Sequence, residues 1–320
     1  MKELLRYLPN FREKKIGVFG DLIADEYVYG TIHRFSREAP VFIVNYEDAQ
    51  ISLGGAANAV NNIHELGGKP FPFGVLGADI PGRTLFNVLK ERGINTDGIL
   101  AEENLNTFVK QRVVAGSPHS VKQQILRIDR CFPLTPDASC HARLIERLRS
   151  MAYHLDALII SDYGLGVAQP SLLKPVLEEL QHRGIPCFVD SRQNLRSFHG
   201  ITAATPNEPE VEAVIGKLVD SVNLFSVGKE LLQKMDMQAL LITRGKNGMA
   251  LFTRNADPQL IPIFGSTDIV DVTGAGDTVI TTFALAIAAG ASLYDAARLS
   301  NCAAGIAVMK RGAATVTRKN

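Results

Sequence analysis

The sequence has 320 residues, of which 46% are hydrophobic, and its 34 basic and 33 acidic side chains leave a formal net charge of +1. A chain of this length can bury a large core, and its balanced charge does not favour nucleic acid or an anionic membrane as a partner. No apolar run reaches the roughly 18 residues that cross a bilayer, and the first residues lack a signal-peptide core, so we expect a cytoplasmic protein.

In chain order, the first predicted element is a buried strand in KKIGVFGD (14–21), and a helical pattern follows in GAANAVNNIHELG (55–67). Apolar runs then alternate with helical patterns through FPFGVLG, RTLFNVLKERG, ALIISDYG, PSLLKPVLEELQHRG, PCFVDS and ALLITRG. This alternation predicts an α/β fold with a mainly parallel sheet flanked by helices on both faces. With no linker or repeat in view, we expect one domain over residues 1–320.

Two segments interrupt this alternation, at about residues 25–50 and 107–128. Both are rich in β-branched and aromatic residues with partial two-residue alternation, and neither contains a helical pattern. They predict a few antiparallel strands that form a small lid on the body. Because lid strands present edges and apolar side chains, we also expect a homodimer in which the lids pair.

The cysteines and histidines indicate neither a disulfide framework nor a metal site. The cysteines form no C-x-x-C pair and are predicted to be reduced thiols: Cys131, Cys140, Cys187 and Cys302. The seven histidines, among them His64 and His141, have no metal-ligand spacing, so we interpret them as structural or surface residues.

The stretch DVTGAGDTVI (271–280) places Gly274, Ala275 and Gly276 between the strand-like FGSTDIVDV (264–272) and the helical DTVITTFALAIAAG (277–290). A glycine turn at a helix N-terminus offers free amides and the positive end of the helix dipole to an anion. A phosphoryl group in transfer is such an anion, and Asp277 is placed to be the base for an attacking hydroxyl. The alternative is that Asp277 is an ordinary residue of a helix start.

A second glycine turn, GGAAN (54–58), enters a helix after the two carboxylates of GDLIAD, Asp21 and Asp25. Carboxylates accept hydrogen bonds from hydroxyls, and the amide of Asn58 both donates and accepts, so this group can orient a polyol. The alternative is a strand-end aspartate and a helix-capping asparagine.

With LGGAANAVNNIHELGG, GADIPG, TPNEPE, TRGKNG and DVTGAGDTVI in this order, the sequence resembles the ribokinase-like (PfkB) carbohydrate kinases from end to end. Within the family it is most similar to the D-glycero-β-D-manno-heptose 7-phosphate kinases of ADP-heptose synthesis. The segments that carry this similarity are GDLIADEYVYG, RFSREAPV, TFVKQRVV, QQILRID, LIISDYG and NCAAGIAVMKRGAATV. The resemblance implies transfer of the γ-phosphate of ATP to the C1 hydroxyl, with Mg²⁺ as cofactor and K⁺ as a possible second ion. Ribose, fructose phosphates and ketodeoxygluconate stay open as other acceptors.

The resemblance also implies roles for individual residues. Asp277 would be the base, and Gly274, Ala275 and Gly276 would form the anion hole for the γ-phosphate. The sugar would be held by Asp25, Gly54, Gly55 and Asn58. The ATP site would include Thr243, Gly245, Gly248 and Asn301, with Asn207 and Glu210 organising Mg²⁺ and its waters. Asp271 and Gly312 match positions near a monovalent cation. A phosphate at the far end of the sugar needs cations, for which the candidates are Lys110, Arg112, Arg127, Arg34 and Arg37.

Two departures from the heptose kinases bear on the choice of sugar. Leu165 stands where those kinases have a lysine, and Asp190-Ser191-Arg192 replaces their Asp-Pro-Lys. Arg192 can keep the positive charge that Leu165 lacks.

Other classes of protein fit the sequence less well. No G-x-G-x-x-G follows the first strand, which disfavours an NAD-binding oxidoreductase, and no P-loop motif is present. A non-catalytic sugar or nucleotide sensor on the same fold would be expected to lack either the base or the anion hole, and the sequence has both.

Overall fold

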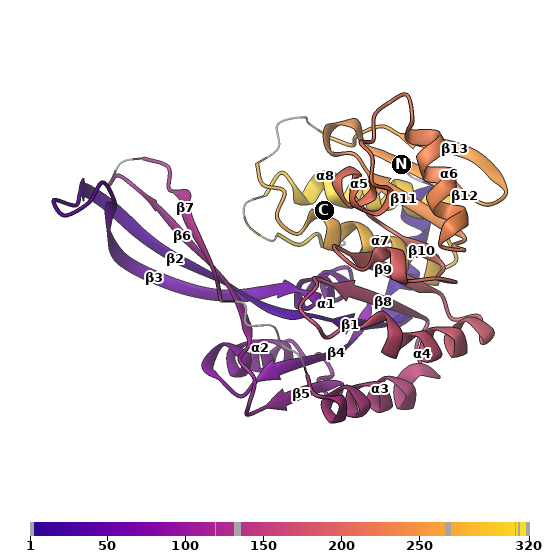
Figure 1. Cartoon of the computed structure of the whole chain (residues 1–320), viewed down its shortest axis with the longest axis horizontal. Helices are drawn as coiled ribbons and strands as arrows, with labels where there is room; N and C mark the ends of the chain where they lie inside the picture. Colours follow the sequence, from indigo (N-terminus) through magenta and orange to yellow (C-terminus); the bar gives the residue numbers. More distant parts are fainter. Residues whose placement is uncertain are drawn as a thin grey trace.

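The computed structural model has a helix-covered body from which a long, twisted lid of strands projects to one side (Figure 1). The structure describes residues 3–118, 120–130, 136–265, 270–310, 312 and 314–317. The body sheet has, in spatial order, β13 (Ala256–Ile261), β12 (Met249–Thr253), β11 (Ala239–Thr243), β10 (Ala203–Ala204), β9 (Cys187–Ser191), β8 (Ala157–Asp162), β1 (Lys15–Gly20), β4 (Lys69–Gly77) and β5 (Ile99–Glu102). Neighbouring strands from β5 through to β11 are parallel, whereas β12 and β13 are antiparallel additions at one edge.

Helices cover both faces of this sheet, and each face has its own apolar core. One layer contains α1 (Ala56–Glu65), α2 (Ile80–Glu91), α7 (Ala275–Ala288), α8 (Leu293–Ala307) and the 3₁₀ helix η1 (Leu4–Glu13). The other contains α3 (Ala138–Ala152), α4 (Pro170–His182), α5 (Glu208–Ile215) and α6 (Leu224–Lys234). Single 3₁₀ turns are η2 (Leu195–Ser197) and η3 (Gly245–Asn247).

The central strands are apolar on both sides because both faces are covered. In β8, Ile159 packs into one core while Leu158 and Ile160 pack into the other. Strand β1 has β4 on one side and β8 on the other, so the order of strands reverses at β1. In open α/β sheets, ligands bind outside the carboxyl ends of the strands at such a reversal.

The lid is a second, four-stranded sheet with the order β3 (Phe42–Gly55), β2 (Leu22–Phe35), β6 (Phe108–Gly116) and β7 (Gln123–Arg130). Each outer strand pairs antiparallel with its inner neighbour, β3 with β2 and β7 with β6. The two inner strands, β2 and β6, run parallel to each other over Ile23–Thr31 and Phe108–Gly116. The expected small β lid is therefore confirmed, and its strands overlap the two predicted segments, whereas the expected antiparallel pairing is wrong at the β2–β6 pair. That pair is parallel because β6 enters the lid from the body at the same end as β2.

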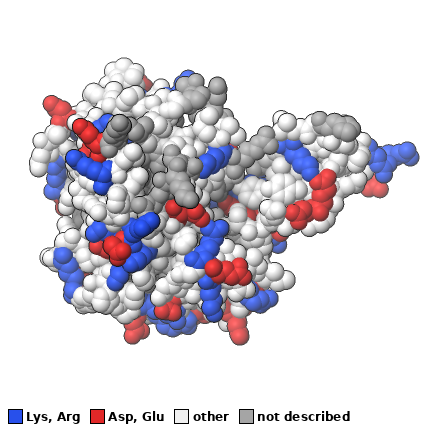
Figure 2. All heavy atoms as spheres, turned by 180° about the vertical axis from the view of Figure 1, so that it is seen from behind, with Lys and Arg blue, Asp and Glu red and all other residues white. Residues whose placement is uncertain are grey.

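Positive and negative side chains are interspersed over the face of the molecule in Figure 2, as the balanced composition predicts.

The α/β fold with a mainly parallel sheet is confirmed. A strand over residues 264–272 is not found in the described part of that range, and residues 266–269 lie outside it. Among the described residues, no helix is both long and apolar enough to cross a bilayer. Cys140, Cys187 and Cys302 are free thiols, as predicted, and Cys131 lies outside the described residues.

Candidate active site

One elongated pocket lies at the carboxyl ends of the body strands and extends under the lid. From the lid and the start of α1 it is lined by Asp25, Gly55, Asn58, Lys110, Arg112 and Arg127. From the body it is lined by Asp162, Tyr163, Asp190, Arg192, Thr205, Asn207, Glu210, Thr243, Gly245, Gly248, Gly274, Ala275, Gly276, Asp277 and Asn301, among others. The sheet thus brings together most of the residues that the sequence singled out.

The glycine turn at the start of α7 leaves some of its amides open, but that of Ala275, which the resemblance places in the anion hole, is already bonded. Gly274 precedes the helix with a φ of 76° in the left-handed region, and no side chain caps the first turn. The amide of Ala275 donates to the Val272 carbonyl at 3.2 Å, and Thr278 N closes the first intrahelical bond to Gly274 O. The N–H groups of Gly276 and Asp277 therefore have no acceptor within the helix, as helix geometry requires of a first turn.

Asp277 is buried, and each of its carboxylate oxygens accepts one side-chain hydrogen bond. Asn58 Nδ2 donates to Oδ2 at 2.6 Å, and the Tyr163 hydroxyl donates to Oδ1 at 3.0 Å. Burial raises the pKa of Asp277 to about 6, and these two hydrogen bonds and the charge of Arg192 oppose that rise. The carboxylate does not cap its helix and is bonded instead to side chains of α1 and of the loop after β8. At neutral pH it is mainly ionised despite its burial, and it is able to accept a proton.

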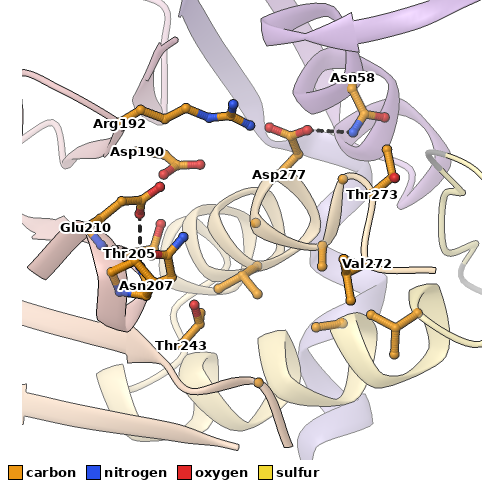
Figure 3. A pocket seen from close by; sticks show the side chains of 18 of the residues that line it. Asn58, Asp190, Arg192, Thr205, Asn207, Glu210, Thr243, Val272, Thr273 and Asp277 are labelled. Carbon is orange, nitrogen blue, oxygen red and sulfur yellow. Dashed lines mark hydrogen bonds between the residues drawn. The ribbon is translucent and has the colours of Figure 1, made fainter. Parts of the chain in front are cut away.

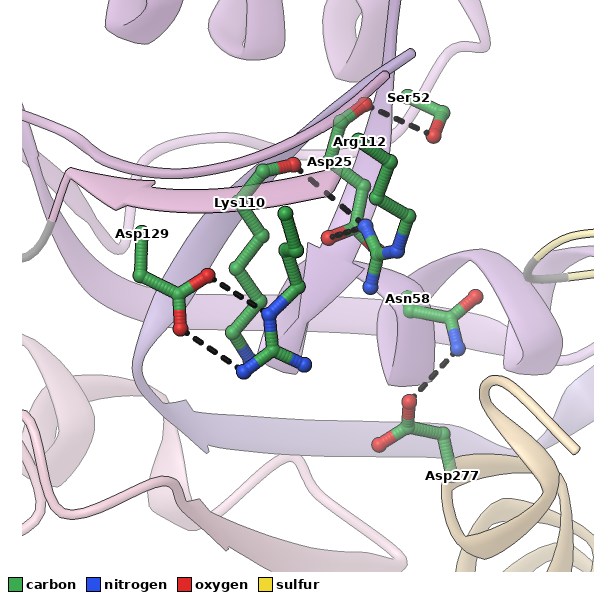
Figure 4. Close-up of polar contacts among 8 residues, drawn as sticks. Asp25, Ser52, Asn58, Lys110, Arg112, Asp129 and Asp277 are labelled. Carbon is green, nitrogen blue, oxygen red and sulfur yellow. Dashed lines mark hydrogen bonds and ion pairs between the residues drawn. The ribbon is translucent and has the colours of Figure 1, made fainter. Parts of the chain in front are cut away.

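The GGAAN turn starts α1 directly opposite α7. Gly55 is the residue before the helix, with a φ of 56°. A Cβ there would lie 2.5 Å from the Asp21 carbonyl, so only glycine fits. Asn58 is the third residue of the helix rather than its cap, and its side chain points to Asp277 (Figure 4).

The structure separates the two carboxylates of GDLIAD. Asp21 is completely buried and accepts hydrogen bonds from three backbone amides, those of Tyr163, Leu165 and Val167. Burial raises its pKa to about 6, and the amides oppose that rise. Asp21 therefore does not contact the pocket as the sequence suggested, because its oxygens are used to hold the loop after β8.

Asp25 lines the pocket on the lid side and is paired with a cation. Arg112 Nη1 lies 2.7 Å from Asp25 Oδ1, and both side chains are nearly buried. A Cβ at Gly54 would lie 2.7 Å from Asp25 Cγ, so this glycine makes the room in which the carboxylate lies. Asp25 and Arg112 thus form a neutral pair at the base of the lid (Figure 4).

The other basic candidates of the lid differ in position. Lys110 is half-buried, with its Nζ 4.5 Å from the centre of the Tyr163 ring, and burial lowers its pKa. Arg127 lines the pocket but is paired with Asp129, at 2.8 Å. Arg34 and Arg37 are exposed at the outer end of the lid and do not line the pocket. Of the basic residues on the lid that line the pocket, only Lys110 forms no ion pair within the described part of the chain.

Asn207 and Glu210 form a reciprocal cap at the start of α5. Asn207 Oδ1 accepts from the Glu210 amide, and Glu210 Oε2 accepts from the Asn207 amide, both at 2.9 Å. Asp190 lies beside Glu210 in the same wall of the pocket (Figure 3). Burial and then the neighbouring charges of Glu210 and Asp277 raise the pKa of Asp190 well above its usual range. Burial likewise raises the pKa of Glu210.

The predicted nucleotide residues lie at the far end of the same pocket. Thr243 ends β11, Gly245 and Gly248 bracket the turn η3, and Asn301 projects from α8 with its Nδ2 2.7 Å from the Pro262 carbonyl. A Cβ at Gly248 would lie 2.1 Å from the Ile261 carbonyl, and its φ is 75°. This end of the pocket therefore depends on close approach of the backbone.

Asp271 lies outside the pocket lining, where it joins two segments of chain. Its Oδ1 accepts from the Thr273 amide and its Oδ2 accepts from the Gly312 amide, both at 2.9 Å. The predicted proximity of Asp271 and Gly312 is therefore correct.

Among the lining residues that sequence reasoning missed, Tyr163 and Asp190 lie closest to the chemistry, and the position of Arg192 was given too little weight. Tyr163 and Asp190 were not named as site residues, and Arg192 was considered only as a substitute charge. Each lies at or just after the carboxyl end of a buried strand, β8 or β9. A polar side chain directly after an apolar parallel strand was the signal that could have found them.

An ionisable carboxylate at an open helix start, glycine turns and the half-buried carboxylates of Asp190 and Glu210 line one pocket of an α/β fold, which is the arrangement expected of a phosphotransferase site. A family model described as "pfkB family carbohydrate kinase" matches residues 14–130 and 138–320, and the chain belongs to this family.

Curated relatives extend beyond this chain. The bifunctional protein HldE of Geobacter metallireducens is 39% identical over 302 residues, which cover 94% of this chain and 60% of the relative. The protein of the same name from Pseudomonas aeruginosa is 37% identical over 311 residues, which cover 97% of this chain and 63% of the relative. The chain thus spans about three fifths of the length of these relatives.

Solved structures share the fold at low sequence identity. Arabidopsis thaliana ribokinase, complexed with ribose and ATP, has a TM-score of 0.70 and 20% identity, with 96% of each chain covered. Escherichia coli phosphofructokinase-2, in complex with potassium, has a TM-score of 0.76 and 16% identity, again with 96% of each chain covered. The ribokinase-like fold expected from the motifs is confirmed.

Proposed function

We propose that this carbohydrate kinase transfers the γ-phosphate of ATP to the C1 hydroxyl of D-glycero-β-D-manno-heptose 7-phosphate, giving the 1,7-bisphosphate. The observation that carries kinase activity is the placement of Asp277, whose ionisable carboxylate lies at the open start of α7 and lines the pocket shared with Asp25 and Thr243. The motifs shared with heptose 7-phosphate kinases support the choice of acceptor.

In the proposed reaction, Asp277 accepts the proton of the sugar hydroxyl as the new O–P bond forms and the bond to the leaving ADP breaks. Asn58 and Tyr163 hold the carboxylate in place, since each donates to one of its oxygens. The free amides of Gly276 and Asp277 face the position where charge accumulates on the transferring group, which favours transfer electrostatically. Asp25 and the amide of Asn58 orient the sugar from the lid side.

The wall of the pocket that contains Asp190, Thr205 and Glu210 is suited to Mg²⁺. Burial and the neighbouring charge of Glu210 raise the pKa of Asp190, and the buried hydroxyl of Thr205 has no hydrogen-bond partner among the described residues. Hard oxygen atoms of this kind, with water and phosphate oxygens, are the ligands that Mg²⁺ takes. Asp190, Glu210 and Asn207 would hold the ion and its waters, and the ion would supply charge neutralisation for the phosphates of ATP.

A monovalent cation site at Asp271 has less support. Both carboxylate oxygens already accept backbone N–H bonds, so a bound K⁺ would use their remaining lone pairs and backbone carbonyls. Potassium in Escherichia coli phosphofructokinase-2 is a property of that protein, and K⁺ dependence here stays a prediction.

We also infer a homodimer formed through the lid. Large apolar side chains are exposed on the lid: Phe35, Val41, Phe42, Tyr46, Val121, Leu126 and Ile128. Strands β3 and β7 are the open edges of the lid sheet. Exposed apolar surface beside an unpaired strand edge favours association of two copies. Light scattering at micromolar concentration should give twice the monomer mass, and a monomer would contradict the inference.

The test of function is ATP consumption with a panel of acceptors: heptose 7-phosphate, fructose 1-phosphate, fructose 6-phosphate, ribose and ketodeoxygluconate. We expect the highest kcat/KM with heptose 7-phosphate. Preference for an unphosphorylated sugar would overturn the heptose assignment and leave the kinase intact. Absence of transfer to every acceptor, with tight binding of sugar or ATP, would favour a non-catalytic sensor.

A further inference from the structure

Two cations lie over the ring of Tyr163, and its hydroxyl donates to Asp277. Arg192 Cζ lies 4.3 Å from the ring centre, Lys110 Nζ lies 4.5 Å from it, and the hydroxyl is 3.0 Å from Asp277 Oδ1. The three side chains come from different parts of the fold, since Tyr163 follows β8, Arg192 follows β9 and Lys110 belongs to the lid strand β6. The ring therefore positions two positive charges next to Asp277.

Arg192 is the more central of the two cations. Its guanidinium points toward the carboxylate of Asp277, and Asp190 lies between its side chain and Glu210 (Figure 3). The side chain is exposed to the pocket and forms no ion pair within the described part of the chain. Burial raises the pKa of Asp277, and the positive charge of Arg192 opposes that rise.

We propose that Arg192 is a catalytic residue that contacts the phosphoryl group during its transfer from ATP to the acceptor. The inference rests on the proposed function and goes beyond it by naming the cation of the transfer step. The space between the base and the carboxylate pair of Asp190 and Glu210 is where the transferring group must pass. Arg192 reaches this space from the Tyr163 ring and donates to the equatorial oxygens while the O–P bond to the acceptor forms and the bond to ADP breaks.

The chemistry of the position favours Arg192 over its neighbours. Arg112 and Arg127 are each paired with a carboxylate, at 2.7 and 2.8 Å, and are not free to neutralise a phosphate. Lys110 belongs to the lid, where it suits an anionic group of the acceptor. A guanidinium offers several N–H donors in one plane, so it can bind two oxygens of a phosphoryl group and still stack on an aromatic ring.

The experiment compares three variants with the wild type by steady-state kinetics on the best acceptor, and measures binding of a non-hydrolysable ATP analogue by calorimetry. In Arg192→Gln we expect kcat and kcat/KM to fall together by about 10²- to 10³-fold, the loss typical of one oxyanion donor. Arg192→Lys should recover part of that loss because it keeps the charge. Binding of the analogue should stay close to the wild-type value.

Arg183→Gln is the matched control, because Arg183 Cζ stacks on the Tyr153 ring at 3.8 Å at the surface, away from the pocket. Its kinetics should equal those of the wild type. A second readout is the acid limb of the kcat/KM profile, which should move to higher pH in Arg192→Gln because Arg192 lowers the pKa of Asp277.

Three outcomes would overturn the inference. If Arg192→Gln keeps the wild-type kcat, Arg192 does not act on the transfer step. If it raises KM only for phosphorylated acceptors, Arg192 binds the phosphate of the acceptor instead. If the wild type transfers phosphate to no acceptor of the panel, the proposed function fails and the inference fails with it. If the wild type is active and Arg192→Gln is equally active, the inference alone is rejected.

Discussion

The two sides of the pocket use charge in opposite ways. On the lid side, both arginines that line the pocket are paired, Arg112 with Asp25 and Arg127 with Asp129, and Lys110 alone of the basic lining residues there forms no ion pair among the described residues. On the body side, Asp190 and Arg192 form no ion pair within the described residues, and Asp277 is held by neutral donors. Paired charges fix the shape of the lid, whereas charges without a partner stay available for ATP, metal and acceptor.

The largest effect should come from the body side. Asp277→Asn removes the base while it keeps the shape of the side chain, so we expect kcat to fall by about 10²- to 10⁴-fold with little change in acceptor binding. Initial-rate kinetics and calorimetric binding of the acceptor measure the two quantities. Turnover close to the wild-type rate would remove Asp277 as the base.

On the lid side, breaking a pair should cost stability. Asp25→Ala leaves the guanidinium of Arg112 nearly buried without its counter-charge, and arginine cannot lose its proton. We expect a loss of about 3 kcal/mol in the free energy of unfolding, measured by urea denaturation. A stability equal to that of the wild type would show that solvent reaches this pair more freely than the structure indicates.

Tyr163→Phe tests whether a neutral donor on the body side lowers the pKa of Asp277, which is measured through the pH dependence of kcat/KM. Because burial raises the folded-state pKa of Asp277 to about 6, the ionised base is lost as pH falls through that value, and kcat/KM should decline below it. The hydroxyl of Tyr163 lowers this pKa, so its removal should move the acid limb upward by about one pH unit.

The control for this variant is Tyr153→Phe, which removes a surface hydroxyl that donates to Glu179 at 3.2 Å. It should leave the profile in place. An acid limb that does not move in Tyr163→Phe would show that this hydroxyl does not influence the protonation of the base.

The smallest effect should come from the exposed pair on the lid. In Arg127→Gln the ion pair with Asp129 is lost, but both side chains are largely in solvent. Surface pairs contribute about 0–1 kcal/mol, so thermal unfolding should change little. A loss as large as that of Asp25→Ala would contradict the distinction between buried and exposed pairs on which the comparison depends.

Much of this site could be predicted from the sequence because its glycine turns are short local patterns. GAGD and GGAAN each start a helix, and each places a polar side chain one turn in, so Asp277 and Asn58 could be named before they were seen to meet. Tyr163 and Asp190 have no such local pattern. Their roles depend on β8 and β9 ending side by side, which is a property of strand order.

Charge pairing was equally hard to predict. Lys110, Arg112 and Arg127 are alike in sequence, and strand register does not separate them, because Lys110 is directly across from Asp25 and Asp129. Those two carboxylates nevertheless pair with Arg112 and Arg127, through side chains that reach past Lys110. Asp25 and Asp21 differ for a related reason, because Asp21 stands at the turn out of β1, where it meets the loop that follows β8.

That loop has a consequence for how the acceptor site can change. Three main-chain amides bonded to Asp21 hold its path, so the path does not depend on which side chains the loop carries. Leu165 packs against Ile23 and Phe108, and so does Tyr163, whose hydroxyl also reaches Asp277. The backbone of the loop can therefore keep its course when either side chain is replaced, but positions 163 and 165 share one packing contact, and of the two it is position 163 that lines the pocket.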